Sequence, residues 1–300
     1  MIVKTIRVVT FNASETAAVK ALFDDLRGHG STWSEEDGDD GARRIFRADG
    51  TDRWEVEHLA LRAQGNVSAA AALAEFQSQT TSRPFAVLVF YGCAGVPTKA
   101  EVGSFYLVRS TTYVSLGKVW NATKGEVGKT APASRWKERG EVASKWLVKS
   151  PNEDDPLPTL QADEDIGPGA VHLARLVPCT LAHVAATDKV IEVDLGIDRA
   201  PSGALPKNTR WTYADALAHV AGRIKAFEDP AMLIDMESYG ILRMAKALGV
   251  SERVAIARVS TDALTDKADP EGLSQEALLT EANPLLGAVL FSILTGRTLL

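Results

Sequence analysis

The run Phe85-Ala86-Val87-Leu88-Val89-Phe90 leads through Tyr91 into Gly92-Cys93-Ala94-Gly95, and this stretch decides the fold class. An unbroken apolar run of this kind is typical of a central strand that is covered on both faces. The small residues that follow predict a turn at the carboxyl end of that strand. Open α/β sheets bind their ligands at such turns, so we expect a ligand site here.

Alternating strand and helix patterns surround this run and continue to the end of the chain, which favours one large α/β unit. Apolar periodicity predicts the other strands at residues 6–10, 54–61, 105–109, 171–177, 181–186, 232–234 and 254–259. The expected helices cover residues 14–26, 67–76, 213–226, 236–248, 275–279 and 285–294, and Ser14 is the expected N-cap of the first.

Three segments differ in composition from the rest. Residues 28–50 are rich in Gly, Asp and Glu and predict an exposed loop, and residues 151–168 form an acidic, Pro-rich segment that predicts a solvated loop. Residues 114–150 form a basic insertion, which is either a solvated surface or a site for a phosphorylated 5′ group. Without repeats or a strong shift in composition, we expect a single domain over residues 1–300.

The overall composition excludes several classes of function. A formal net charge of -6 argues against a nucleic-acid partner. Two cysteines and five histidines lack metal-ligand spacing, so we expect neither a metal nor a disulfide, and a reducing cytoplasm is the simplest compartment. The apolar stretch 285–294 is too short to span a bilayer, so no membrane partner is expected. Without a dinucleotide or phosphate-loop motif, we expect no cofactor.

Two acidic motifs carry the expected chemistry. Ile234-Asp235-Met236-Glu237 places Glu237 at the start of a predicted helix, where an acid also complements the helix dipole. Arg258-Val259-Ser260-Thr261-Asp262 is a second predicted strand that ends in a polar turn with a carboxylate. We expect the two carboxylates at adjacent strand ends, facing one substrate.

These motifs resemble those of the methylthioadenosine/S-adenosylhomocysteine nucleosidases and their nucleoside phosphorylase superfamily. The similarity rests on five segments in the expected order: Val8-Val9-Thr10 with Glu15, Gly65-Asn66 with Ala69 to Ala72, Gly92 to Gly95, Ala186 to Ile191, and Asp235-Met236-Glu237. It implies a three-layer α/β/α fold with a mixed central β-sheet, a purine nucleoside or nucleotide as the small-molecule partner, and a homodimer.

The resemblance also implies roles for individual residues. Glu237 would bind the ribose hydroxyls, with Met236 packed against the sugar, and Asp262 would protonate the departing base. Glu15 would orient the attacking water, or else be an exposed acid in the first turn of a helix. Arg258 would position the acid that follows it, or else be a salt-bridged strand residue. The remaining substrate-binding positions are Cys93, Ala94 and Gly95 on the ribose side and Val190 and Ile191 beside the base.

The chain departs from the family pattern at three places. Gly103-Ser104 stands where relatives commonly have Gly-Asp, the last motif carries an additional Thr261, and Val190 lacks an aromatic ring.

The nucleophile is expected to be water. A phosphorylase needs donors for a phosphate ion, but residues 11–19 contain no Arg. The resemblance also implies that Cys93 occupies the position where a phosphate-binding Ser would be expected. The sequence therefore favours a hydrolase that cleaves the N-glycosidic bond. The alternatives are a phosphate-dependent phosphorylase and a non-catalytic nucleoside or nucleotide sensor on the same scaffold.

Overall fold

A computed structural model describes much of the chain. The described residues are 4–27, 32–38, 41–47, 54–61, 64–79, 87–96, 101–113, 118–121, 146–149, 159–161, 170–186, 231–263 and 273–294. The strands are β1 (Lys4–Thr10), β2 (Thr32–Gly38), β3 (Gly41–Arg47), β4 (Trp54–Ala60), β5 (Val87–Val96), β6 (Phe105–Tyr113), β7 (Lys118–Asn121), β8 (Trp146–Lys149), β9 (Thr159–Gln161), β10 (Thr180–Ala186), β11 (Ala231–Asp235) and β12 (Val254–Ala263). The helices are α1 (Ala13–Arg27), α2 (Asn66–Gln79), α5 (Ala170–Leu176), α7 (Ser238–Ala247), the short η4 (Ser251–Arg253), α8 (Gln275–Glu281) and α9 (Asn283–Leu294).

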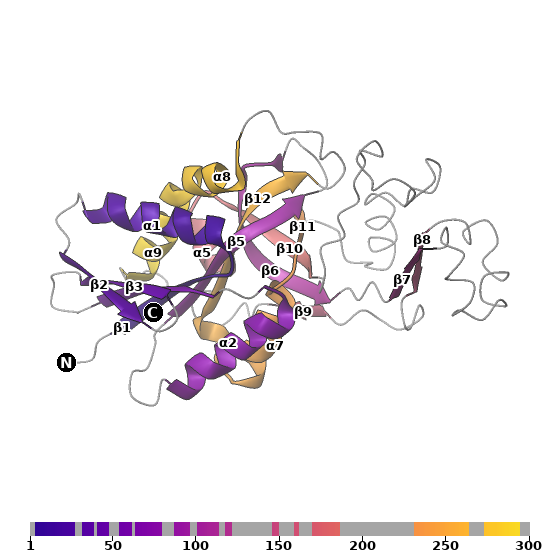
Figure 1. Ribbon diagram of the computed structural model, residues 1–300, viewed down its shortest axis with the longest axis horizontal. Helices are drawn as coiled ribbons and strands as arrows, with labels where there is room; N and C mark the ends of the chain where they lie inside the picture. The colour runs from indigo at the N-terminus through magenta and orange to yellow at the C-terminus, as the bar shows by residue number, and fades with distance from the viewer. Residues whose placement is uncertain are drawn as a thin grey trace.

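A mixed ten-stranded sheet forms the centre of the fold (Figure 1). Its strands lie in the order β11-β10-β6-β12-β5-β1-β4-β3-β2, and β9 pairs with β6. An antiparallel pairing of Ile234 on β11 with Gly95 on β5 closes five of these strands, β5, β12, β6, β10 and β11, into a barrel. The expected mixed sheet is confirmed. The expected three-layer α/β/α arrangement is not, because five strands of the sheet close into a barrel.

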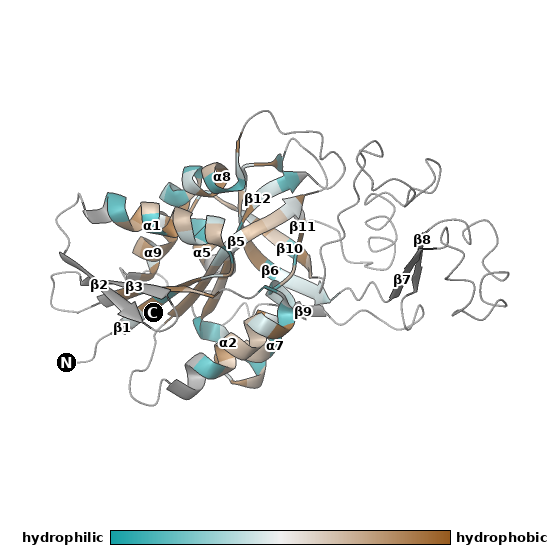
Figure 2. Cartoon of the chain, viewed as in Figure 1, coloured by the Kyte–Doolittle hydropathy of each residue, from teal (hydrophilic) through white to brown (hydrophobic). Residues whose placement is uncertain are grey.

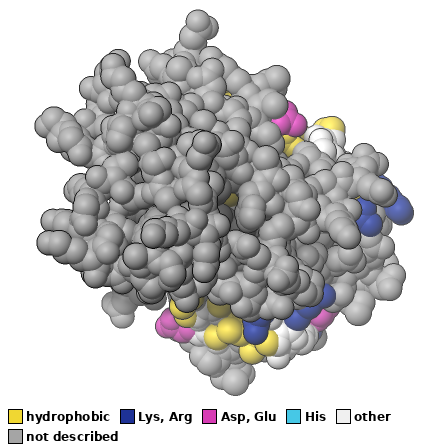
Figure 3. Space-filling view, turned by 90° about the vertical axis from the view of Figure 1, so that its right-hand side faces the viewer, with side chains coloured by type: hydrophobic (Ala, Val, Ile, Leu, Met, Phe, Trp, Pro, Cys, Tyr) yellow, Lys and Arg dark blue, Asp and Glu magenta, His cyan; other side chains and the backbone are white. Residues whose placement is uncertain are grey.

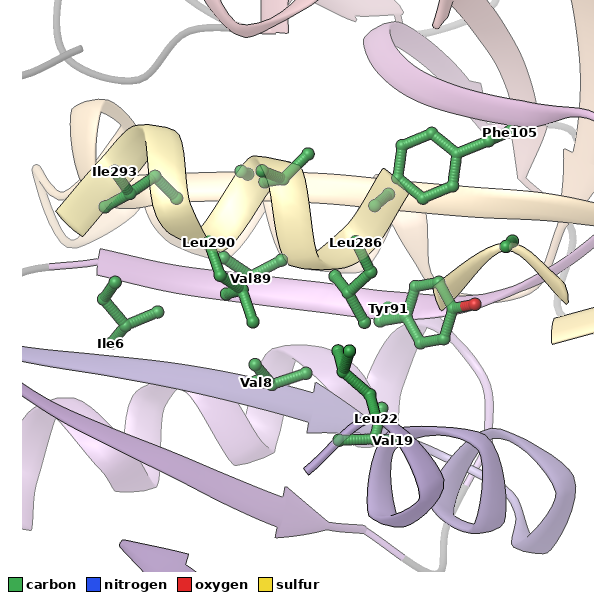
Figure 4. Close-up of a cluster of buried hydrophobic side chains, with 14 of the residues drawn as sticks. Ile6, Val8, Val19, Leu22, Val89, Tyr91, Phe105, Leu286, Leu290 and Ile293 are labelled. Atoms are coloured by element: carbon green, nitrogen blue, oxygen red, sulfur yellow. The ribbon is translucent and has the colours of Figure 1, made fainter. Parts of the chain in front are cut away.

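Helices cover both faces of the sheet, because β5 and β12 present apolar side chains on both sides. On one face α1, α5, α8 and α9 pack against Val87, Val89 and Tyr91 of β5, together with residues of β1, β6 and β12 (Figure 4). On the other face α2 and α7 pack against Leu88 and Phe90. Figure 2 shows both hydrophilic and hydrophobic residues along α1, α2 and α8, as expected for helices that bury one side. Each fully buried Leu or Val contributes about 1.5–3 kcal/mol.

The two-stranded sheet β7–β8 stands apart from the ten-stranded sheet and is antiparallel. It belongs to the predicted basic insertion, most of which lies outside the described residues. Figure 3 looks onto the molecule from this side, and the described side chains visible there include both Lys or Arg and Asp or Glu. The described side chains on this face therefore carry both positive and negative charges.

Within the described residues, no single helix has the length and apolar composition needed to cross a membrane. Helices α8 and α9 pass that test only together, as a pair bent by 46°.

The predicted strands at residues 6–10, 54–61, 105–109, 181–186, 232–234 and 254–259 are confirmed as β1, β4, β6, β10, β11 and β12. The predicted helices at 14–26, 67–76, 236–248, 275–279 and 285–294 are confirmed as α1, α2, α7, α8 and α9. The predicted helix at 213–226 lies outside the described residues.

Several expectations were wrong. The segment predicted as a strand at 171–177 instead contains helix α5, Ala170–Leu176. Leu173 and Val177 are buried at helical spacing, whereas Arg175 between them is exposed. Helix α1 begins at Ala13, and Asn12 Oδ1 accepts the Glu15 N–H at 2.9 Å, so Asn12 rather than Ser14 occupies the capping position.

The expected loops also contain strands. β2 and β3 occupy most of residues 28–50, and their register pairs Glu35 with Arg44 and Glu36 with Arg43. Residues of opposite charge therefore stand opposite each other in this hairpin, which composition alone does not reveal. β9 lies within the acidic segment 151–168 and pairs antiparallel with β6. The expected turns at 92–95 and 260–262 are parts of β5 and β12, each of which continues past the motif.

Candidate active site

Glu15 lies in the first turn of α1, but its carboxylate is buried rather than exposed to solvent. Its Oε2 atom accepts hydrogen bonds from the backbone N–H groups of Phe11, at 2.7 Å, and Asn12, at 3.1 Å. Its Oε1 atom accepts the backbone N–H of Cys93 at 3.0 Å and the Cys93 thiol at 3.2 Å. Donors from the end of β1 and from β5 thus fix the Glu15 carboxylate between the two strands, so it does more than complement a helix dipole.

Arg258 is fully buried on β12 and is salt-bridged, which was one of the two alternatives for this residue. Its Nε atom donates to Asp235 Oδ2 at 2.8 Å, and its Nη2 atom lies 3.8 Å from Glu237 Oε2. Nη2 has no hydrogen-bond partner within the described part of the chain. A buried guanidinium needs a paired carboxylate. Asp235 supplies it, which leaves one Arg258 donor beside Glu237.

Asp235 also fixes the start of α7. Its carboxylate accepts the backbone N–H of Ser238 at 3.2 Å and a short hydrogen bond from the Ser238 hydroxyl. The same carboxylate therefore holds the guanidinium of Arg258 and the first turn of the helix that carries Glu237. This double role orients Glu237 relative to Arg258.

Gly92 makes the approach of Glu15 to Arg258 possible. Arg258 is paired in register with Gly92 on the neighbouring strand β5. A Cβ atom at Gly92 would lie 2.7 Å from Glu15 Oε1 and 3.1 Å from Arg258 Nη1. Glycine is thus required here because a carboxylate and a guanidinium occupy the space above its backbone.

Glu237 stands between the start of α7 and the start of α2. Its Oε1 atom accepts the backbone N–H of Gly65 at 3.0 Å, and Gly65 adopts a φ of 102°, which favours glycine. Asn66 Oδ1 accepts the backbone N–H of Gly240 at 2.8 Å and so joins the two helices. Burial, and then the neighbouring Asp235 carboxylate, raise the pKa of Glu237 to about 7, although Arg258 acts in the opposite direction.

Cys93, Ala94 and Gly95 lie within β5. Cys93 is partly buried, whereas Ala94 and Gly95 are buried. Asn12 Nδ2 donates to Cys93 Sγ at 3.5 Å. Burial, followed by the charge of Glu15, raises the pKa of Cys93 well above its usual range, so this residue is a thiol that donates to Glu15.

Asp262 lies on β12, beyond a break in the register between β12 and β5. Ser260 pairs with Ala94 and Asp262 pairs with Gly95, so Thr261 is left as an additional residue between them. Gly95 also pairs with Ile234 on the other side of β5. We had expected the two acidic motifs on adjacent strands, and this expectation was wrong. β5 separates them by two strand spacings, about 10 Å.

The structure thus brings Glu15, Cys93, Glu237 and Arg258 together and places Asp262 across β5 from the end of β11. Met236 is partly buried between Asp235 and Glu237. Val190 and Ile191 lie outside the described residues. In the described part of the chain, no group of three or more His, Cys, Asp or Glu side chains is arranged to hold a metal ion.

The roles of Asp235, Asn12 and Gly65 were not predicted from the sequence. Asp235 was recognised only as half of an acidic pair, whereas it is the partner of Arg258. An arginine in an otherwise apolar strand is a signal for such a partner, because a buried guanidinium requires a carboxylate. Gly65 gave no comparable signal, since its N–H meets Glu237 only through the packing of α2 on α7.

No model of a protein family matches the sequence, and no curated protein matches it. Solved structures do match the fold over nearly the whole chain. One is the 5′-methylthioadenosine/S-adenosylhomocysteine nucleosidase of Campylobacter jejuni, at 13% identity and a TM-score of 0.56, which covers 97% of this chain and 98% of that one. Another is the futalosine hydrolase of Helicobacter pylori, at 11% identity and a TM-score of 0.56, with 96% and 98% covered.

A third is the 5′-methylthioadenosine/S-adenosylhomocysteine nucleosidase of Neisseria meningitidis in complex with methylthio-immucillin-A. It is 15% identical, has a TM-score of 0.55, and covers 96% of this chain and 99% of that one. This chain therefore has the fold of these nucleosidases and this hydrolase, as the resemblance in its sequence led us to expect.

Proposed function

We propose that this protein hydrolyses the N-glycosidic bond of a purine nucleoside or nucleoside derivative and releases the free base and the free sugar. The observation that carries the proposal is the buried group of Glu15, Glu237 and Arg258, held by hydrogen bonds from three separate elements. A buried acid with a perturbed pKa, such as Glu237, is a candidate for a functional site. The similar structures are those of nucleosidases and a hydrolase, which supports the same class of reaction.

Glu237 is proposed to act on the sugar. Cleavage of the C–N bond leaves positive charge on the ribose, and an ionised carboxylate beside the ring stabilises that charge. Gly65 and Arg258 hold the Glu237 carboxylate in place, so little rearrangement is needed as the charge develops. Met236, partly exposed beside it, is proposed to pack against the sugar.

Asp262 is proposed to act on the base. The electron pair of the breaking bond passes to the base, and the acid form of Asp262 supplies a proton to a base nitrogen. The backbones of Asp262 and Ile234 lie about 10 Å apart across β5, a separation that suits a sugar at one end and a purine at the other.

Glu15 is proposed to orient the attacking water and to take its proton. The N–H groups of Phe11, Asn12 and Cys93 already bind the Glu15 carboxylate, so these donors are occupied by a negative group. A phosphate ion would meet that negative charge instead of free donors, whereas water is neutral. This arrangement favours hydrolysis over phosphorolysis.

The test is a set of incubations with adenosine, methylthioadenosine, adenosylhomocysteine, AMP and ATP, followed by chromatography for the released base. We expect base release in phosphate-free buffer, at a rate equal to that in phosphate buffer of the same ionic strength. A rate that saturates with added phosphate would make the protein a phosphorylase. No release from any of the five compounds would favour a binding module.

Glu15→Gln tests the role of the proposed base. It should slow hydrolysis by about 10²–10⁴-fold, the usual contribution of one general base. The matched control is Glu276→Gln, since Glu276 also lies in the first turn of a helix but is exposed. Equal effects of the two changes would return Glu15 to the role of a helix-terminal acid.

A further inference from the structure

The strand that carries Asp262 is held by a polar cluster next to its register break. Ser260, two residues before Asp262, is fully buried. Its hydroxyl donates a short hydrogen bond to the carbonyl oxygen of Glu101 and accepts the backbone N–H of Ser104 at 3.0 Å. The turn formed by residues 101–104 therefore binds this side chain as both donor and acceptor.

The backbones of the same segments are also joined. The Ser260 N–H donates to the Ser104 carbonyl at 3.0 Å, and the Gly103 N–H donates to the Ser260 carbonyl at 2.7 Å. Gly103 has a φ of 88°, which allows the turn to fold back toward β12. The turn thus holds Ser260 through its hydroxyl, its N–H and its carbonyl.

The additional residue of the break contacts a different element. Gln275 Nε2, in the first turn of α8, donates to Thr261 Oγ1 at 3.4 Å. Consecutive residues at the break therefore contact different elements, and Asp262 then resumes the pairing with β5 opposite Gly95. Without the break, Asp262 would stand opposite Val96, one residue or about 3.3 Å further along, with its side chain on the other face.

We infer that Ser260, bound by the turn at residues 101–104, is a positioning residue that sets the strand register of the acid Asp262. This inference rests on the proposed function, because it assigns Asp262 the delivery of a proton to the leaving base. A proton donor must lie within hydrogen-bond reach of its acceptor, so a shift of one strand position removes it from the reaction. Ser260 itself touches neither the base nor the sugar in this role.

The test compares two leaving groups in the same variant. A purine needs a proton as it departs, whereas 4-nitrophenolate leaves as a stable anion and does not. In Ser260→Ala we expect kcat for the purine nucleoside cleaved by the natural protein to fall by about 10–100-fold, part of the usual contribution of one positioned acid. The rate with 4-nitrophenyl riboside should change by less than about twofold.

Asp262→Asn should show the same selective loss, which makes it the positive control. Ser292→Ala is the matched structural control, because Ser292 is also a buried serine but lies on α9. It should leave the ratio of the two rates unchanged. An equal fall for both substrates in Ser260→Ala would overturn the positioning role.

Gly103→Ala gives a second route if Ser260→Ala does not fold. A Cβ at Gly103 has room, since its nearest neighbour is Leu278 Cδ2 at 3.6 Å, but the positive φ strains the turn. This variant should also lose purine release selectively, and an unchanged ratio would contradict the inference. If the natural protein cleaves neither 4-nitrophenyl riboside nor any purine nucleoside, the proposed function fails, and the role of Ser260 fails with it.

Discussion

The carboxyl group of Glu237 lies in surroundings that disfavour its ionised form. Burial and the adjacent Asp235 raise its pKa to about 7, and the proposed chemistry needs the ionised form beside the developing cation. We therefore expect kcat/KM to fall tenfold for each pH unit below about 7. The measurement is a pH profile of kcat/KM, and an acid limb centred near the ordinary pKa of a glutamate would contradict this expectation.

The same carboxyl group links stability to pH. Because the pKa of Glu237 is raised in the folded protein, its contribution to stability is present below pH 4.5 and is lost as the pH rises to about 7. Glu237→Gln cannot ionise, so it should be nearly inactive and yet more stable than the natural protein at pH 8, by about 1–3 kcal/mol. Denaturant unfolding at pH 5 and pH 8 measures this. A variant that is less stable by the same amount at both pH values would refute the link.

Both cysteines should react slowly with alkylating reagents. Burial raises the pKa of Cys179 to about 11, and burial together with Glu15 raises that of Cys93 well above its usual range. The thiolate is the reactive form, so iodoacetamide at pH 7 should label each at least about tenfold more slowly than it labels free cysteine. Mass spectrometry of timed samples gives the rates. Fast labelling of Cys93 would mean that its thiol is not held against Glu15.

At the scale of elements, the contact between α2 and α7 places Glu237. A Cβ at Gly240 would lie 2.0 Å from the backbone oxygen of Asn66, so Gly240→Ala must push the two helices apart. We expect the free energy of unfolding to fall by about 1–3 kcal/mol. We also expect kcat to fall, because the Gly65 N–H would no longer reach Glu237. Thermal unfolding and kcat are the measurements.

Gly287→Ala is the matched control for this change. Gly287 is also a helical glycine, but its Cβ would meet only Leu22 Cδ1 at 3.7 Å, an ordinary contact. This variant should be neutral or more stable by up to about 1 kcal/mol, since alanine favours a helix. Similar losses in both variants would show that the close approach of Asn66 to Gly240 has no special role.

Elements with an unambiguous apolar period could be predicted from the sequence, and others could not. β5, β12 and α1 follow continuous or helical apolar patterns, so local burial determines them. α5 is short, and its apolar residues at 171, 173, 174 and 176 do not distinguish a helix from a strand, so its packing on α9 determines the helix. β2 and β3 carry charged residues whose pairing appears only once the strands are aligned.

Some residues of the site could likewise be predicted from the sequence, and others could not. Glu15, Glu237, Arg258 and Asp262 stood in recognisable motifs, so the sequence identified them as candidates. The role of Asp235 depends on the Arg258 guanidinium reaching it across Gly92, and the role of Ser260 depends on the turn at residues 101–104. These are contacts between distant segments, which no local pattern encodes.

At the scale of the whole molecule, closure of the barrel assembles the site. The pairing of Ile234 with Gly95 joins β11 to β5 and so brings the segment of Asp235 and Glu237 to the strand that neighbours Arg258 and Asp262. In an open sheet with β11 at one edge, three strands would separate β11 from β5. The barrel is therefore the feature of the fold on which the proposed chemistry depends.

A buried histidine within this barrel makes its stability depend on pH. His183 on β10 shares hydrogen bonds with Ser110 Oγ at 2.7 Å and Thr112 Oγ1 at 3.0 Å, both on β6. Burial lowers its pKa from 6.5 to about 4, so the folded barrel keeps the ring neutral. As the pH falls from 6.5 to about 4, the unfolded chain binds a proton that the folded chain does not, and the folded state is progressively destabilised.

We expect the natural protein to lose about 2 kcal/mol of stability from this residue between pH 7.5 and pH 5. His183→Gln keeps a polar side chain that can bind hydroxyl groups but has no proton to gain, so it isolates this contribution from the carboxylates that also titrate. The variant should be less stable than the natural protein at pH 7.5, and the difference should shrink or reverse at pH 5. Denaturant unfolding at both pH values measures the two differences. Parallel losses in the natural protein and the variant would show that His183 gains its proton in the folded barrel as readily as in the unfolded chain, and the Ser110 and Thr112 contacts would then not enforce a neutral ring.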